Sequence, residues 1–575
     1  MSKKTWARSL ICTVITTLLA TTAACSGGGS NSSNPDINAG PTVTGEINPG
    51  IIEYNIPATT PENAAQLLSR ATFGTTHAAI DAVMQDGIAL WVEKQFTLKG
   101  PAHLDYVRQY SNGSLRSPRH DYWWVQATLG KDQLRQRMAF ALSEIMVISD
   151  IGYSLSNSQY GVTRYYDKLL ENSFGNYRDL LEEVTLSPVM GLYLSMLQNA
   201  RGDPETNTRA DENFAREVMQ LFSIGLHELE NDGTVKTLNG KPIPAYTQTD
   251  VENYARVFTG WNYFNPRAWN QTLNTGGDLI SNMAPVEEYH DVDSKTLIDG
   301  QQTPAGVTAE EDLKVALDSL ANHPNVGPFI GKQLIQKLVT SNPSPAYVGR
   351  VATAFNNNGE GVRGDLTAVL RAILFDEEAF SGSTSQPNFG KLREPIMRLT
   401  HLWRAFNVQP GTDAINGAFN TGSPALVGID SVIGQGPLLA TSVFNFYRPD
   451  FTPQGPTYRA NVLVPEAEIY TDNNILATTS RVNAQIQRFY LQNPDTVQRR
   501  WSHIDLSREL ALVDKPEELL DELNVLLMSG SMGDPMRAAL IDHMALFGDT
   551  DEDRSRAVRD VISLIVASPD YLVQM

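Results

Sequence analysis

Residues 365–374 read Asp-Leu-Thr-Ala-Val-Leu-Arg-Ala-Ile-Leu, and their apolar side chains recur at intervals of three and four. This spacing places the apolar side chains on one face of an α-helix, with Asp365 at the position that caps its start. The same period recurs in residues 134–147, 165–170, 326–339, 519–527 and 557–567. Alternating patterns are scarce, so short strands or hairpins are expected only around 233–244 and 287–297. The sequence predicts a mainly α fold, a large multi-helix globular body with long irregular loops and a few short strands.

The helical body is expected to begin near Thr60-Pro61, because proline suits the first turn of a helix. A main helical domain is expected over residues 60–490. A polar stretch near 493–506 then separates a C-terminal helical part, residues 491–575, which is expected to pack on the main domain.

The first 24 residues have the order of a secretory signal peptide. Lys3, Lys4 and Arg8 precede an apolar run over residues 10–20, and small residues follow at 22–24. The apolar run is too short to cross a bilayer, which takes roughly 20 residues. We therefore expect residues 1–24 to be a signal peptide and the protein to be exported.

Cys25 follows these small residues directly and precedes a glycine- and serine-rich stretch. This arrangement resembles the lipobox of bacterial lipoproteins, although Thr22 stands where leucine is usual. The resemblance implies lipidation of Cys25 and an anchor in the cell envelope at the outer membrane. The Gly-, Ser-, Asn- and Pro-rich composition predicts a flexible linker over residues 25–59. The alternative is ordinary cleavage near Ala24, which leaves a soluble periplasmic protein.

Cysteine content and charge exclude several classes of chemistry. Cys12 and Cys25 are the only cysteines, so a mature lipidated chain has no thiol for catalysis, iron–sulfur clusters, cysteine-bound zinc or c-type haem. The net charge of −20 opposes binding to nucleic acid, which depends on clustered lysine and arginine. It suits a soluble surface, divalent cations or a neutral substrate. The expected partners are the membrane, through the lipid, and other envelope proteins.

Glu217 lies in the polar and aromatic segment 211–225. A helix there places Glu217 at the edge of the apolar stripe formed by Phe214, Val218 and Leu221. A carboxylate at that edge is either half-buried and functional, or tied to an arginine for structural reasons. Glu212 and Arg216, four residues apart, are expected to pair on the surface.

The next segment, residues 246–261, combines a cap with aromatic side chains. Thr247 and Asp250 form a capping pattern, which accounts for Asp250 without catalysis, although Asp250 is also a candidate catalytic carboxylate. Trp261, Tyr263 and Trp269 are candidate substrate-binding residues that can stack on a sugar ring or simply belong to the core.

Residues 289–295 bring together His290, Asp291, Asp293 and Lys295. The first three are candidate ligands of a divalent cation, and His290 with Asp291 is a candidate acid/base pair. A surface turn stabilised by aspartate side chains is the structural alternative. The spacing does not match the helical zinc motif of metalloproteases, so a zinc enzyme is not expected. The cofactor stays undetermined, a divalent cation being one possibility.

Common catalytic signatures are absent from the sequence. It has no nucleophile elbow, no phosphate-binding loop followed by Lys-Ser/Thr, and no dinucleotide fingerprint. This argues against α/β-hydrolases, P-loop NTPases and nicotinamide-dependent dehydrogenases. Carboxylate-pair chemistry such as glycoside hydrolysis is compatible with the acidic content, but the sequence does not identify a pair, because the two carboxylates meet only in three dimensions.

A series of collinear motifs lies at residues 64–74, 213–217, 221–225, 246–251, 258–261, 290–291, 329–334, 434–437, 442–447 and 568–574. Together these motifs resemble the large bacterial family called domain of unknown function 1800. The likeness spans nearly all of residues 60–575. It implies one extended, mainly helical, exported domain and assigns no reaction or catalytic residue.

Two functions follow as hypotheses. The first is an exported cell-envelope lipoprotein that takes part in assembly or export of surface material without catalysis. The second is a periplasmic or surface hydrolase, or polysaccharide-modifying enzyme, that uses Glu217, Asp250 or the His290–Asp291 pair near Trp261. The second hypothesis expects Glu217, Trp261 and His290 around one pocket.

Overall fold

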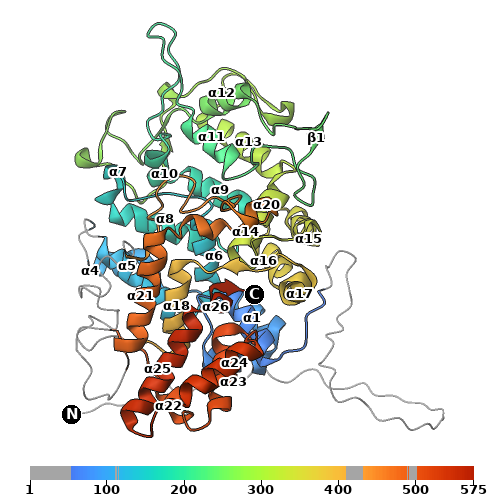
Figure 1. Cartoon of the computed structure of the whole chain (residues 1–575). Coiled ribbons are helices and arrows are strands. Elements are labelled where there is room, and N and C mark those ends of the chain that lie inside the picture. Colours follow the sequence, from blue (N-terminus) through green and yellow to red (C-terminus); the bar gives the residue numbers. More distant parts are fainter. Residues whose placement is uncertain (1–53, 111–112, 114–115, 410–431, 489, 491–501) are drawn as a thin grey trace, which may run out of the picture. The chain divides into compact units, whose positions relative to one another are not determined.

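Helices make up most of the computed structural model, which describes residues 54–575 except 111–112, 114–115, 410–431, 489 and 491–501. The predicted signal peptide, Cys25, most of the predicted linker and the predicted domain boundary at 491 lie outside the described residues. Where the structure is described, no helix is long and apolar enough to cross a membrane. The mainly α prediction is confirmed, and residues 47–575 cluster as one unit (Figure 1).

The first part of the body begins where the sequence predicted. Thr60 caps the first helix by accepting a hydrogen bond from the Asn63 amide, and Pro61 opens its first turn. The helices of this part are α1 (Pro61–Ala71), α2 (His77–Asp86), α3 (Ile88–Thr97), α4 (His103–Tyr110), α5 (Ser117–Leu129), α6 (Gln133–Ser143), α7 (Tyr153–Ser156), α8 (Gln159–Asn172), α9 (Tyr177–Thr185) and α10 (Pro188–Tyr193).

The middle part alternates helices with short strands and 3-10 turns. Its elements are α11 (Asn213–Gln220), β1 (Thr237–Leu238), β2 (Lys241–Pro242), α12 (Gln248–Val257), β3 (Trp261–Asn262), η1 (Leu273–Thr275), β4 (Ala284–Pro285), η2 (Glu287–Tyr289), β5 (Lys295–Thr296), η3 (Ile298–Gly300), β6 (Gln302–Thr303) and α13 (Ala309–Asn322). The hairpin expected at 233–244 is β1–β2, turned by Asn239 and Gly240 at positive φ. The strand expected within 287–297 is β5, preceded by a 3-10 turn.

A second helical group follows, and it contains the stretch that opened the sequence. Asp365 caps α16 by accepting hydrogen bonds from the amides of Thr367 and Ala368, as predicted. The elements are α14 (Val326–Leu338), α15 (Pro345–Asn356), α16 (Leu366–Leu374), α17 (Glu377–Ser385), β7 (Lys391–Leu392) and α18 (Pro395–Ala405). α14 packs on α15 and α6, and α15 packs on α16, so the apolar face of each helix is buried against another.

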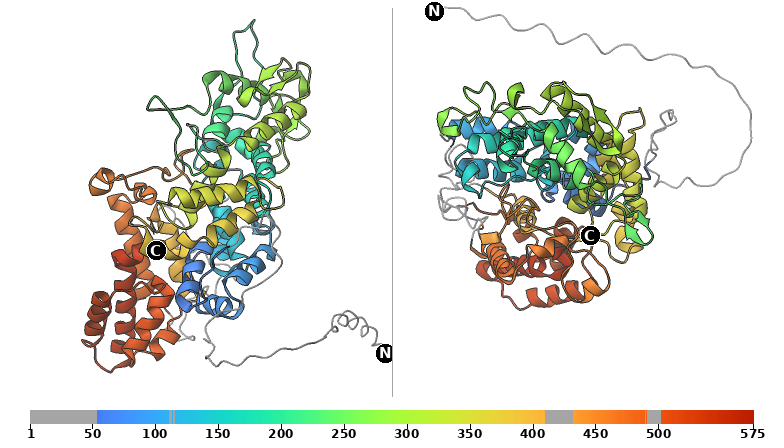
Figure 2. Two further views of the ribbon diagram at one scale, coloured as in Figure 1. Left: turned by 90° about the vertical axis from the view of Figure 1, so that its right-hand side faces the viewer. Right: turned by 90° about the horizontal axis from the view of Figure 1, so that it is seen from above.

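The last part packs back on the first. Its elements are α20 (Pro456–Arg459), η5 (Pro465–Glu468), α21 (Asp472–Arg488), α22 (Ser507–Ala511), α23 (Pro516–Met528), α24 (Asp534–Met544), α25 (Asp551–Ala567), α26 (Pro569–Leu572) and β8 (Val573–Gln574). α23 contacts α1, and β8 pairs antiparallel with β7. In Figure 2 the C-terminal helices, coloured red, lie beside the N-terminal helices, coloured blue. Segments from the two ends of the described chain therefore share one core.

Candidate functional site

Glu217 is buried on α11 without an ion pair to arginine in the described part of the chain. Its side chain is 8% exposed, and its Oε2 atom has no hydrogen-bond partner there. Burial raises its pKa, and nearby Arg216 acts in the opposite direction. Arg216 pairs instead with Glu212 at 3.0 Å, as the sequence predicted.

Asp250 performs the predicted cap at the start of α12. Its Oδ2 accepts a 2.7 Å hydrogen bond from the Thr247 amide, and the Asp250 amide donates to Thr247 Oγ1. Each side chain therefore accepts a hydrogen bond from the backbone amide of the other residue at the start of the helix, which gives Asp250 a structural role.

The three candidate aromatic residues lie in one segment, 261–269, in which the Asn262 side chain donates to the Trp269 carbonyl oxygen at 2.9 Å. Trp261 and Tyr263 are each 2% exposed, so their ring faces are covered. Trp269 stacks on Tyr289 with ring centroids 3.9 Å apart and an interplanar angle of 8°. Trp261 also lines a polar cavity of about 520 Å³, and its Nε1 has no acceptor among the described residues.

His290 and Asp291 point to different partners. The His290 ring places Nε2 3.1 Å from Asp312 Oδ2 and Nδ1 3.0 Å from the Thr259 carbonyl oxygen. Lys295 also donates to Asp312. Asp291 instead accepts two hydrogen bonds from Arg256, at 2.8 and 3.0 Å.

The cation ligands proposed from the sequence are therefore not gathered. Asp293 is exposed, and its backbone amide donates to Asp291. Across the residues that the structure describes, no three His, Cys, Asp or Glu side chains form a group that could hold a metal ion. Glu217 and His290 do not line the polar cavity to which Trp261 contributes.

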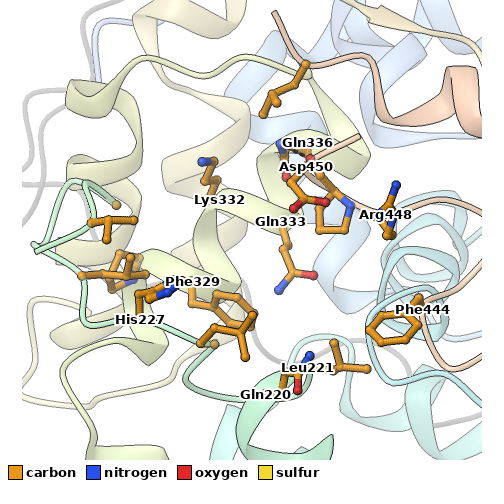
Figure 3. Close-up of a pocket in the computed structure, with 18 residues that line it drawn as sticks. Gln220, Leu221, His227, Phe329, Lys332, Gln333, Gln336, Phe444, Arg448 and Asp450 are labelled. Carbon is orange, nitrogen blue, oxygen red and sulfur yellow. Dashed lines mark hydrogen bonds between the residues drawn. The ribbon is translucent and has the colours of Figure 1, made fainter. Parts of the chain in front are cut away.

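A different cavity, of about 360 Å³, is built from three of the motifs quoted above (Figure 3). It joins the end of α11 and the loop after it, α14, and the segment around 444–450. Its walls comprise Gln220, Leu221, Gly225, Leu226, His227, Leu229, Gly233, Val235, Pro328, Phe329, Lys332, Gln333, Gln336, Phe444, Arg448, Pro449, Asp450 and Leu463. Most of this lining is apolar, which is typical of small-molecule sites.

The loop after α11 is held against α14 by a close packing contact and by side-chain hydrogen bonds. Gly225 has φ +74°, and a Cβ there would lie 2.8 Å from the Phe329 ring, so only glycine fits. Asn325, just before α14, donates to the carbonyl oxygens of Ile224 and His227 and accepts from the Leu229 amide. The wall formed by the loop is thus fixed to the helix that carries the polar lining.

The polar lining of the cavity comes mainly from consecutive turns of α14. The side-chain amide of Gln336 donates through Nε2 to the carbonyl oxygens of Ser341 and Pro449, each at 3.1 Å. The bond to Pro449 connects the helix to the 444–450 segment. Burial lowers the pKa of Lys332, and Asp450 opposes this change. The Nε2 atom of Gln333 is buried without an acceptor in the described structure.

A family model described as "Protein of unknown function (DUF1800)" matches residues 66–573. The chain belongs to this family. No curated protein and no solved structure matches it. The resemblance inferred from the motifs is confirmed, and three of those motifs in this DUF1800 chain meet at one cavity.

In this DUF1800 protein, α14 also contributes Lys337 to a buried cluster of charged side chains beside the cavity. Lys337 lies 3.4 Å from Glu144, while Lys391 lies 3.5 Å from Glu394 and 3.2 Å from Glu466. Burial and the nearby Glu394 raise the pKa of Glu144 to about 7. Burial acts to raise the pKa of Glu394 too, but the surrounding cations hold it at about 2.

The motifs at 434–437 and 442–447 supply polar partners to this cluster. Gln435 donates to Glu394 at 2.6 Å, and Asn445 donates to Glu144 at 3.3 Å. Sequence reasoning missed the cluster and the polar groups at Lys332 and Gln333. The sequence signal that indicates such a cluster is a charged residue inside an apolar helical pattern. Glu144 is an example, since it lies within the apolar stretch 134–147 and directly after the end of α6.

Proposed function

We propose that this protein is an exported, lipid-anchored component of the cell envelope that binds an apolar part of surface material during its assembly or export. The observation that carries the proposal is the convergence of three distant motifs on one mostly apolar cavity of about 360 Å³. The arrangement of the first 25 residues supports export and lipidation of Cys25.

The mouth of the cavity supports binding over catalysis. Leu226, Val235 and Phe444 line it and are 52%, 40% and 45% exposed. Apolar side chains grouped around a cavity lose contact with water when a ligand covers them, which favours association. This driving force needs no reaction.

A neutral apolar dye tests the binding role. The full chain with Cys25→Ala, purified without detergent, is titrated with Nile red. Leu221→Trp fills the cavity and is expected to abolish dye binding. Leu238→Trp, at a site 67% exposed on β1 and outside the cavity lining, is the matched control and is expected to bind as the parent does. Equal dye binding by both variants would contradict the proposal.

The location is tested separately in cells. Palmitate labelling of the parent and its absence in Cys25→Ala are expected if Cys25 is lipidated. An unlabelled parent recovered in the periplasmic fraction would support the soluble periplasmic alternative instead. The intact, uncleaved chain in the cytosol would overturn both versions of the localisation.

A polysaccharide-modifying enzyme is the second candidate, and the polar cavity at Trp261 favours it. Carboxylates of Asp179, Glu182, Glu310 and Asp318 line this cavity. Arg178 pairs with Glu182 and Asp318, which leaves the exposed Asp179 and Glu310 as the carboxylates available to a sugar. Release of reducing ends from envelope polysaccharide by the parent, but not by Asp179→Asn or Glu310→Gln, would support this function.

A further inference from the structure

The cavity on α14 presents hydrogen-bond donors that the protein itself does not use. In the described structure, Lys332 Nζ makes no hydrogen bond or ion pair, and Gln333 Nε2 is buried without an acceptor. Buried polar groups in proteins are nearly always paired, so the buried Gln333 Nε2 indicates an acceptor supplied from outside. Lys332 is half-buried at the same cavity, where its ammonium group is available to water or to a bound anion. An ammonium group offers only donors, which selects an acceptor-rich, anionic group.

The two donors serve different parts of a ligand. In Figure 3 the side chains of Lys332 and Gln333 leave α14 in different directions. A single compact anion therefore does not satisfy both. Both donors are satisfied by a longer ligand. Its anionic end binds Lys332, and a hydrogen-bond acceptor along its apolar body binds Gln333.

The other charges at the cavity leave Lys332 as its half-buried cation. Arg448 is paired with Glu468 at 3.1 Å and faces water. Asp450 is exposed, so water screens its carboxylate, whereas Lys332 is partly withdrawn from solvent. Burial disfavours the charged form of Lys332, and an anion bound beside it would restore that form.

Size separates a small amphiphile from a peptide. A volume of about 360 Å³ lies at the lower end of the range for small-molecule sites, roughly 300–1,000 Å³. It suits one apolar chain with its end group. The net charge of the whole chain, −20, repels anions elsewhere on the protein, which adds to the selectivity of a site where Lys332 offers a positive charge.

We propose that this cavity binds an anionic amphiphile, an apolar chain that ends in a carboxylate or a phosphate, with the anion at Lys332. This inference rests on the proposed function and names the ligand class of the same site. The two end groups share the chemistry that Lys332 recognises, and the experiment below separates them.

The test compares three ligands of equal chain length by titration calorimetry: decanoate, decyl phosphate and the neutral 1-decanol. The protein is the full chain with Cys25→Ala in detergent-free buffer. The parent is expected to bind at least one of the two anions about tenfold more tightly than decanol. Whichever anion binds better identifies the end group.

Variants then assign the preference to individual residues. Lys332→Met is expected to remove the anion preference while decanol still binds, and Asp450→Asn is expected to strengthen anion binding about two- to threefold. Lys314→Met, an exposed lysine outside this cavity, changes the net charge equally and is expected to leave the preference intact.

The outcomes separate the two proposals. An unchanged anion preference in Lys332→Met, or equal affinity of the parent for all three ligands, would overturn the inference but leave apolar binding in place. Failure of the parent to bind any of the three, together with failure to bind Nile red, would overturn the proposed function itself.

Discussion

The ammonium group of Lys337 lies 3.9 Å from the centroid of the Tyr447 ring, inside the protein. Lys337 belongs to α14, and Tyr447 ends the motif that supplies Asn445 to Glu144. The contact therefore joins a wall of the apolar cavity to the buried charge cluster. The hydroxyl of Tyr447 is buried without a hydrogen-bond partner in the described part of the chain.

Tyr447 is expected to stabilise the fold through its ring and not through its hydroxyl. Tyr447→Phe retains the cation–π contact and removes an unpaired buried polar group, so stability should stay equal or rise by up to about 1 kcal/mol. Tyr447→Leu loses the ring and leaves a void, which should cost about 2 kcal/mol. Urea unfolding measures both, and a larger loss in the Phe variant would show that the hydroxyl has a partner.

Asp121 on α5 is expected to lower stability as the pH rises. Its Oδ1 is buried without a partner in the described structure, and burial raises its pKa from 3.8 to about 8. The folded state holds this proton where the unfolded state has lost it, so stability present below pH 4 falls as the pH rises towards 8. Asp121→Asn should therefore raise the melting temperature clearly at pH 8 and hardly at pH 4. The same increase at both values would rule out titration of Asp121 as the cause.

Gly260 is expected to tolerate no side chain. It has φ +83°, and a Cβ there would lie 2.9 Å from the backbone nitrogen and the Cβ of His290. Gly260→Ala should cost about 3 kcal/mol, from backbone strain and overlap together. Gly240 has φ +75° with open space around it, so Gly240→Ala isolates the strain and should cost about 1 kcal/mol. Equal losses would mean that contact with His290 contributes nothing.

Asp312 is expected to be the most sensitive member of the buried group with His290 and Lys295. Burial acts to raise its pKa, but hydrogen bonds from His290 and Lys295 hold it below the usual value. Asp312→Asn leaves the buried Lys295 with only the more distant Asp291, at 3.9 Å, as a countercharge, and should cost about 3 kcal/mol at pH 7. The loss should shrink at low pH, where the parent's aspartate is protonated as well. Asp514→Asn, in an exposed pair with Arg554, should change stability little.

Local sequence rules predicted the helices and their caps. The periodicity over 326–339 and 365–374 gave α14 and α16, and the caps at Asp365 and Thr247 formed as expected. These features succeed because a helix and its cap are decided within a few residues. The 134–147 helix instead ends at Ser143, just before Glu144 turns into the charge cluster.

The candidate site could not be predicted in the same way. Glu217, Trp261 and His290 lie within one dense stretch of sequence, but His290 turns to Asp312, which lies outside that stretch. Lys332 looks like any solvent-facing lysine of an amphipathic helix. Its position in a cavity depends on the loop after α11 and the segment at 444–450, which long-range packing brings to it.

Two contacts of the folded protein join segments that lie far apart in the sequence. Arg70 in α1 donates to the carbonyl oxygen of Met575, a residue 505 positions further along. In the same way, β7 pairs with β8, which follows it much later in the chain. During synthesis the earlier partner emerges first, so the buried guanidinium of Arg70 has to remain hydrated until residue 575 arrives. The packing around α1 and β7 therefore stays incomplete until the segment at 573–575 has been made, so the core of this protein is completed late in folding and not while its first helices emerge.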